Sequence, residues 1–405
     1  MLQLGIAMER RDNLSVLATP DTSPWAERTR SEPPADDPRG SYQRDRDRIL
    51  HCASFRKLQH KTQVLVVHEG DYFRTRLTHT LEVTQIGRTL ARWLKLQEDL
   101  VEAICLGHDL GHAAFGHAGE QELQSLLAQH GMKWNANAHS LTIVENLEVQ
   151  YPEGRGLNLT WATREGLSRH NTKYDVPDET GEYGKYGQPS LEAQVANLAD
   201  VIAYSTHDVE DALFAGLLEV GDFGRLGVDI WDRSWQKASG EVGADSLAGS
   251  SVGSDRKQLR ITRARRHLID LLNRDVHSEA LERANQREVT TLAKARDLEE
   301  PLVVFSAEVA RQIETLLNFM MKAVYKAPLV ARQNYRARYI IRRLFEALLS
   351  DPSLLPLAVR ELINNSCPPP LEVARFLAGL TDRGAVDLYS ELFEPMGRAM
   401  GHRIP

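Results

Sequence analysis

The stretch CLGHDLGHAAFGHAGEQEL, residues 105–123, carries an unusual density of imidazole side chains on a backbone rich in glycine. Its histidines and glycines are His108, His112, His117, Gly107, Gly111, Gly116 and Gly119. Each glycine weakens a helix by about 1 kcal/mol relative to alanine. Departures of this kind from local preference are expected at functional sites. The stretch is therefore predicted to be part of one.

The composition restricts the classes of protein to which this chain can belong. Its 405 residues suffice for one large or two ordinary domains. Asp and Glu number 56 against 49 for Lys and Arg, which argues against a dedicated nucleic-acid coat or a membrane-surface protein. Three widely spaced cysteines fit a reducing compartment. Because no run of 18 apolar residues occurs, we expect a cytoplasmic protein without a membrane partner.

Helical patterns dominate the chain. Residues 76–94 and 98–107 show the apolar spacing of amphipathic helices, and residues 191–220 form the longest clear helical pattern. Strand-like alternation is nearly absent. The sequence therefore predicts an all-α fold.

The chain divides into four parts by composition. Residues 1–40 are polar and rich in proline, so we expect a mobile N-terminal arm. Residues 41–235 form the predicted catalytic core, and within it the proline- and glycine-rich segment 152–190 is expected to loop around the site. The low-complexity residues 236–256 are predicted to be a flexible loop. Residues 257–405 are predicted to be a C-terminal helical region packed on the core.

The adjacent residues His108 and Asp109 offer a nitrogen and an oxygen ligand to a metal ion. This mixture suits Mn, Fe, Zn or Mg better than a thiolate site would. Two ligands are too few, so others must come from elsewhere in the chain. Asp200 lies in an apolar run, and a buried carboxylate needs a partner such as a metal. His79 lies in an amphipathic helix, where a lone histidine is more often an ordinary core or surface residue.

One face of the predicted helix 191–220 is polar. Five titratable side chains follow one another at helical spacing: Asp200, Tyr204, His207, Asp208 and Asp211. Positions spaced by three or four residues share a face. The face is predicted to border a cleft, although polar faces are more often simply solvated.

Four blocks in order along the chain resemble the HD-domain phosphohydrolases, and more closely the deoxyguanosine-triphosphate triphosphohydrolase-like proteins. They are FRKLQHKTQV (55–64), DYFRTRLTHTLEV (71–83), GHDLGHAAFGHAGE (107–120) and LEAQVANLADVIAYSTHDVED (191–211). The resemblance runs from about residue 38 to at least 220, and more loosely to about 390. It implies the HD fold, with a helical C-terminal extension.

The resemblance implies a single divalent metal ion held by four residues: His79, His108, Asp109 and Asp200. Mn²⁺ or Mg²⁺ is favoured, with Fe, Co or Zn as alternatives. The implied reaction is attack of water on the α-phosphorus of a deoxynucleoside triphosphate. Its products are a deoxynucleoside and intact inorganic triphosphate.

Catalytic and substrate-binding residues also carry over from the family. His117 and Glu120 correspond to a catalytic pair, and His112 is expected to face the same pocket. For the substrate, Arg76 matches an arginine that grips a phosphate, Gln63 and Asp208 match positions near the 3′-hydroxyl, and Tyr204 matches a tyrosine that packs on the deoxyribose. The alternatives are an ion pair of Arg76 with Glu82 or Asp71, and an ordinary exposed role for Gln63.

One block departs from the family. Where relatives show FEGNAQS or FEHNAQS, this chain has KWNANAHS (133–140), with Asn135 in place of the acid and His139 in place of glutamine. A contact behind the metal ligands or the choice of base is expected to differ. No guanine preference is therefore inferred.

Several partners and functions stay open. Family resemblance implies a homo-oligomer, a hexamer or tetramer, and a nucleotide effector is a further candidate. The basic segment 332–343, with interleaved tyrosines, is a candidate site for single-stranded DNA, for the polyphosphate tail, or simply a solvated helix face. The alternative functions are an HD phosphohydrolase for nucleoside monophosphates or signalling nucleotides, and a nucleotide- or DNA-sensing protein that retains the fold.

Overall fold

The structure is a computed structural model that describes residues 13–32, 37–63, 74–152, 154–178, 181–243, 251–364 and 367–394. Within these ranges the chain forms helices and isolated β-bridges, without a sheet. The predicted all-α fold is therefore confirmed. None of the described helices combines the length and the apolar character needed to cross a bilayer.

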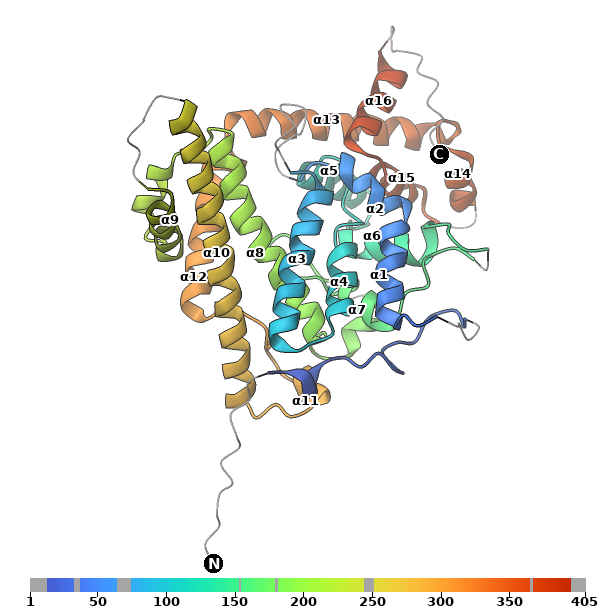
Figure 1. Cartoon of the computed structure of the whole chain (residues 1–405). Helices are drawn as coiled ribbons and strands as arrows, with labels where there is room; N and C mark the ends of the chain where they lie inside the picture. The colour runs from blue at the N-terminus through green and yellow to red at the C-terminus, as the bar shows by residue number, and fades with distance from the viewer. Residues whose placement is uncertain are drawn as a thin grey trace, which may run out of the picture.

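Three helices form the centre of the molecule (Figure 1): α3 (Arg76–Leu94), α4 (Glu98–Gly107) and α8 (Leu191–Phe214). The bounds of α3 and α4 match those predicted. A capping box starts α3, because the Thr75 hydroxyl accepts a hydrogen bond from the Thr78 N–H and the Thr78 hydroxyl accepts one from the Thr75 N–H. Local signals of this kind explain why the boundary could be predicted.

Helix α8 is shorter than the predicted 191–220. It begins after Ser190, whose hydroxyl accepts from the Ala193 N–H, and it ends at Phe214. The Leu217 N–H turns back to the Ala212 carbonyl oxygen at 3.0 Å and closes the last turn. The apolar residues Leu217 and Leu218, which continue the pattern, lie in this turn, and a separate short helix, Val220–Arg225, follows.

Five further helices complete the core around this centre: α1 (Ser41–His51), α2 (Ala53–Lys57), α5 (Gly116–Ala128), α6 (Ala136–Thr142) and α7 (Trp161–Ser168). Helix α1 packs along α4, and α6 packs on α7. Helix α7 lies inside the segment 152–190 that was expected to be a loop. Its start is set by Thr160, whose side chain accepts from the Thr163 N–H.

The C-terminal region packs on the core in two groups. The first contains α9 (Asp229–Val242), α10 (Ser251–Gln286), α11 (Leu292–Arg296) and α12 (Ala307–Met320), with apolar residues that join those of α3 and α8. The second contains α13 (Pro328–Ser350), α14 (Leu357–Asn364), α15 (Pro369–Ala378) and α16 (Asp382–Phe393), which share a second apolar cluster with α5. Figure 1 shows α13 running across one end of the bundle.

The prediction of a flexible loop at 236–256 is wrong over most of its described length. Helix α9 continues to Val242, and α10 begins at Ser251; residues 244–250 lie outside the described residues. Trp231 and Ala238 are buried where α9 packs against α10. This packing stabilises a helix whose small and polar composition is typical of a loop.

The prediction of a mobile arm is also wrong for residues 13–32. Leu14 and Leu17 are completely buried in the main apolar cluster. The N–H and hydroxyl of Thr19 donate to the Glu192 carboxylate at 3.0 and 2.7 Å, at the start of α8. Residues 1–12 and 33–36 of the predicted arm lie outside the described residues. Burial of two leucines thus anchors a segment that looks polar overall.

We expect the substitution Leu17→Ala to lower the free energy of unfolding by about 2–5 kcal/mol, because it leaves a cavity in the core. Val16, its neighbour, is 60% exposed, so Val16→Ala should change it by less than about 0.5 kcal/mol. Urea unfolding followed by circular dichroism would measure both. Equal, small effects of the two substitutions would show that the arm does not contribute to the folded core.

Candidate functional site

The glycine-rich stretch is a turn between two helices. Helix α4 ends at Gly107 and α5 begins at Gly116, so two of the glycines stand at helix ends. A Cβ atom on Gly111 would lie 2.1 Å from the Ala136 carbonyl oxygen. The start of α6 can therefore pack directly on the turn only because residue 111 has no side chain. The turn carries His108, Asp109 and His112.

The four predicted metal ligands come together at this turn, and all four are buried. His79 Nε2 lies 2.9 Å from Asp200 Oδ1. His108 Nε2 lies 3.6 Å from Asp109 Oδ1 and 3.8 Å from Asp200 Oδ1. Helix α3, the end of α4 and the middle of α8 thus each supply donor atoms to one small volume.

The donor atoms fit a divalent cation. His108 Nδ1 lies 2.6 Å from the Cys105 carbonyl oxygen, so Nδ1 carries the proton and Nε2 presents its lone pair. His108 Nε2 and Asp109 Oδ2 are both buried and have no hydrogen-bond partner among the described residues. A buried polar atom without a partner is costly. An ion bound by nitrogen and carboxylate oxygen would satisfy both atoms.

The charges in this cluster are strongly coupled. Burial opposes the charged form of Asp109, but the guanidinium of Arg76 and the neighbouring imidazoles together outweigh it and hold the pKa of that carboxyl well below its usual range. Burial acts in the same way on Asp200, whose hydrogen bonds to His170 and His79 lower its pKa. Both carboxylates are therefore ionised, as metal ligands must be.

His170, which the sequence interpretation missed, lies in the same cluster. Its Nε2 is 3.3 Å from Asp200 Oδ2, and its ring centroid is 5.1 Å from that of His108. The ligand atoms of His108, His170 and Asp200 lie within 4.8 Å of one another, as do those of His79, His108 and Asp109. His170 follows α7 in a loop, where no periodicity marks a residue as facing the site.

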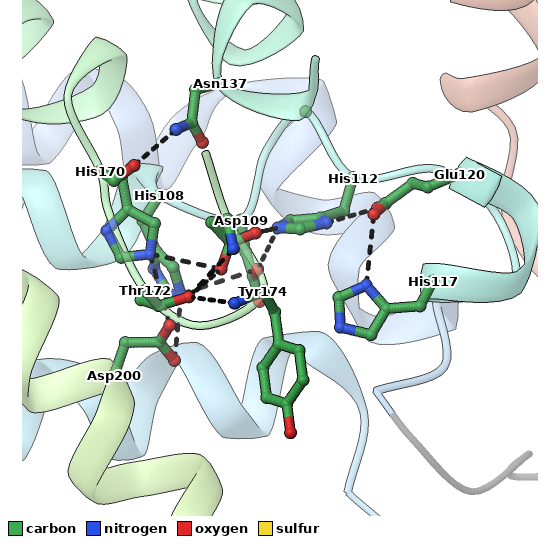
Figure 2. Close-up of polar contacts among 12 residues, drawn as sticks. His108, Asp109, His112, His117, Glu120, Asn137, His170, Thr172, Tyr174 and Asp200 are labelled. Atoms are coloured by element: carbon green, nitrogen blue, oxygen red, sulfur yellow. Dashed lines mark hydrogen bonds and ion pairs between the residues drawn. The ribbon is translucent and has the colours of Figure 1, made fainter. Parts of the chain in front are cut away.

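The block KWNANAHS (133–140), which departs from the family pattern, holds the loop of His170 in place. The side-chain amides of Asn135 and Asn137 both donate to the Val176 carbonyl oxygen at 3.0 Å, and Asn137 also donates to that of His170 at 2.7 Å (Figure 2). Asn135 caps α6 as well, because its oxygen accepts from the Ala138 N–H. His139 is buried beside Trp134, with ring centroids 5.0 Å apart. An acidic residue at position 135 could still accept the hydrogen bond that caps α6, but it could not donate to the Val176 carbonyl oxygen as Asn135 does.

The predicted catalytic residues form a second cluster beside the first. Figure 2 shows Glu120 between two imidazoles, with Oε1 2.5 Å from His112 Nδ1 and Oε2 3.4 Å from His117 Nδ1. The side chain of His117 is 44% exposed and that of His112 only 3%. His117 is therefore the imidazole that a bound molecule can reach.

Electrostatics support a shared proton network in this second cluster. Burial alone would raise the pKa of Glu120, but His112 and His117 hold it well below its usual range. Burial disfavours the charged form of His117, yet the hydrogen bond to Glu120 and the negative charge of that carboxylate outweigh this effect and raise the pKa of His117. His112 also lies 3.2 Å from Asp109 Oδ1 and 3.4 Å from Asp175 Oδ1 through its Nε2. His112 thus connects the predicted catalytic pair, His117 and Glu120, to the cluster of predicted metal ligands.

A cavity of about 730 Å³ opens in front of both clusters. All the predicted site residues except His79 and His108 line it: Gln63, Arg76, Asp109, His112, His117, Glu120, Asp200, Tyr204 and Asp208. The predicted cleft beside the polar face of α8 is therefore present. His79 and His108 lie behind it, against the two aspartates.

The part of the cavity near Tyr204 is aromatic. The rings of Tyr174 and Tyr204 are 5.2 Å apart, and the hydroxyl of Tyr325 donates to Asp208 Oδ2. Burial raises the pKa of Asp208 to about 6. Tyr325 precedes α13, so the C-terminal region contributes directly to this wall.

Arg76 pairs with Asp109 and not with Glu82, one of its two alternative partners. Its Nη1 lies 2.6 Å from Asp109 Oδ1, whereas Glu82 pairs with Arg74. Asp71, the other alternative, lies outside the described residues. Arg76 thus contacts a predicted metal ligand while it faces the cavity.

Two family models match the chain. The HD domain matches residues 76–205, and the phosphohydrolase-associated domain matches residues 303–391. The chain is 41% identical to a deoxyguanosinetriphosphate triphosphohydrolase-like protein of Syntrophus aciditrophicus, over 90% of this chain and 90% of that protein. Proteins of the same description from Geobacter sulfurreducens and Bordetella pertussis are 39% and 41% identical, over 89% and 92% of this chain and 91% and 95% of theirs.

The matched HD domain contains the four residues of the metal cluster and the His117–Glu120 pair, and the similarity to these relatives extends over nearly the whole chain. The chain therefore belongs to the deoxyguanosinetriphosphate triphosphohydrolase-like proteins, a family of HD-domain phosphohydrolases.

Proposed function

We propose that this protein hydrolyses deoxynucleoside triphosphates to a deoxynucleoside and inorganic triphosphate, with a divalent metal ion bound by His79, His108, Asp109 and Asp200. The observation that carries the proposal is the cavity that Asp109 and Asp200, two of the predicted metal ligands, line together with the exposed imidazole of His117. The names of the relatives agree with it.

The proposed reaction joins a water oxygen to the α-phosphorus and breaks the bond from phosphorus to the 5′-oxygen. A bound divalent ion would lower the pKa of water and neutralise charge on the phosphate. His117, held by Glu120, passes a proton to the departing 5′-oxygen. Arg76, whose guanidinium faces the cavity, donates to a phosphate oxygen.

The cavity suits a long, highly charged tail. Besides Arg76, three cations line it: Lys173, Lys326 and Arg338. Five carboxylates line the same cavity, and Arg76 is already paired with one of them, Asp109. Lys173, Lys326 and Arg338, together with a bound divalent ion, would neutralise a triphosphate tail, and we propose this substrate over the alternatives, nucleoside monophosphates and signalling nucleotides.

All four predicted metal ligands are present, and Glu120 connects His112 with His117. Both features favour an enzyme over a sensing protein that merely keeps the fold. Binding of single-stranded DNA, a nucleotide effector, assembly into a homo-oligomer and a cytoplasmic location stay predictions from the sequence, as does the choice among Mn²⁺, Mg²⁺, Fe, Co and Zn.

Product analysis tests the proposed reaction. The purified protein is incubated with each of the four deoxynucleoside triphosphates, singly and mixed, with Mn²⁺ or Mg²⁺. We expect inorganic triphosphate and deoxynucleoside in equal amounts. Release of phosphate or pyrophosphate instead would contradict the proposal and favour one of the alternative hydrolases.

Removal of one metal ligand should empty the site. We expect the purified protein to bind about one divalent ion per chain, and the substitution Asp109→Ala or His108→Ala to lose most of it. Elemental analysis by mass spectrometry measures the content directly. His117→Ala is the control and should keep its metal. Full metal content in both ligand variants would contradict the assigned ligands.

Loss of the exposed imidazole should affect turnover alone. We expect His117→Ala to lower kcat about 10²- to 10⁴-fold, the usual contribution of a general acid or base. Steady-state kinetics with a deoxynucleoside triphosphate measures this effect. A near-normal kcat in His117→Ala would indicate that another residue transfers the proton, and His112 is the next candidate.

Tyr204 should set the preference for deoxyribose. It lies one helical turn beyond Asp200 and faces the cavity, so a 2′-hydroxyl would collide with its ring. We expect Tyr204→Ala to reduce the ratio of kcat/KM for dGTP to that for GTP, and Asp208→Ala mainly to raise KM for both. The exposed Tyr335 serves as a control. An unchanged ratio in Tyr204→Ala would remove the steric explanation.

A further inference from the structure

The turn that delivers His117 has an unusual backbone. Phe115 and Gly116 both have left-handed conformations, with φ of +64° and +56°. For a residue with a side chain this conformation costs about 1–2 kcal/mol. It persists only where the surroundings hold it. Because His117 follows directly, the conformation of these two residues determines where its imidazole points.

A carboxylate from the far end of the chain holds this turn. Asp382, the first residue of α16, is 6% exposed, and its Oδ1 accepts a hydrogen bond from the Phe115 N–H at 2.7 Å. Its Oδ2 accepts from the Thr62 N–H at 2.9 Å and from the Thr62 hydroxyl at 2.5 Å. One side chain thus satisfies three donors from two separate core segments.

The segment at Thr62 is itself part of the site. Thr62 forms a β-bridge with Thr75, and the Arg76 N–H donates to the Lys61 carbonyl oxygen at 3.1 Å. A Cβ atom on Gly116 would lie 3.3 Å from the Gln63 carbonyl oxygen, so the two segments are in close contact. Asp382 therefore ties the start of α3 to the start of α5.

A buried lysine makes a second link between the same parts. Lys61 Nζ donates to the His112 carbonyl oxygen at 2.7 Å and to the Ala378 carbonyl oxygen at 2.9 Å, at the end of α15. The turn between α4 and α5 is thus attached to the C-terminal region at two points, at His112 through Lys61 and at Phe115 through Asp382.

We infer that Asp382 is a positioning residue for His117: through the Phe115 N–H and Thr62 it holds the left-handed turn that directs the imidazole into the cavity. Asp382, which belongs to the phosphohydrolase-associated region (residues 303–391) and lies outside the cavity lining, then contributes to proton transfer without contacting the substrate. The inference rests on the proposed role of His117, and its structural part can be tested without any substrate.

The test compares Asp382→Ala with Asp387→Ala, a control on the same helix whose side chain is 52% exposed. We expect Asp382→Ala to lower kcat about 10- to 100-fold, the effect of a small misplacement of a catalytic group, while KM and metal content stay unchanged. In a His117→Ala background the same substitution should change kcat less than about 3-fold, because residues that act as a unit are not additive. Asp382→Asn, which keeps the side-chain volume, replaces Asp382→Ala if the latter does not fold.

Hydrogen exchange supplies the readout that needs no substrate. We expect faster exchange of the amides in residues 113–118 in the Asp382 variant, and no change in the Asp387 control. An equal fall in kcat with and without His117, a change in KM alone, or unchanged exchange in residues 113–118 would overturn the inference. If no deoxynucleoside triphosphate is hydrolysed, the proposed function fails, and the exchange experiment still decides whether Asp382 holds the turn.

Discussion

Asp200 is an ionised carboxylate buried inside a helical bundle, and the arrangement of the core follows from the need to surround it. An isolated buried charge is very unfavourable. Its two oxygens contact His79 from α3 and His170 from the loop after α7, and His108 at the end of α4 lies 3.8 Å away. These segments can meet only if α3 and α4 pack on α8, which they do. The apolar faces supply the stability, and the buried carboxylate specifies which segments must meet.

Local signals made the bounds of α3 and α4, and the start of α8, predictable to the residue. The capping box of Thr75 and Thr78 marks the start of α3, and amphipathic spacing marks the lengths of α3 and α4. The polar face at Asp200, Tyr204 and Asp208 does border a cavity, because residues spaced by four point the same way wherever the helix is placed. In these cases the information lies within a few residues of the feature.

The parts that could not be predicted depend on tertiary contacts. Leu14 and Leu17 anchor the N-terminal segment only because α3 and its neighbours present an apolar surface to them, and composition alone made that segment look mobile. Helix α9 likewise depends on tertiary packing, because it buries Trp231 and Ala238 and packs on α10. His170 and Asp175 reach the site on a loop that Asn135 and Asn137 hold from another segment. The hydrogen bond from Asn137 to the His170 carbonyl oxygen joins residues 33 positions apart, and no local sequence pattern predicts it.

The walls of the cavity come from both halves of the chain, and this division explains why the two family models occur together here. The HD domain contains the predicted metal ligands and the imidazoles beside them, while Tyr325 and Arg338 come from the C-terminal region. Because Tyr325 donates to Asp208, the surface proposed to receive the sugar is completed by that region. An HD domain alone would keep its ligands but lose one wall of the cavity and both anchors of the turn before α5. The C-terminal helices are therefore better understood as part of the site than as an appendage to it.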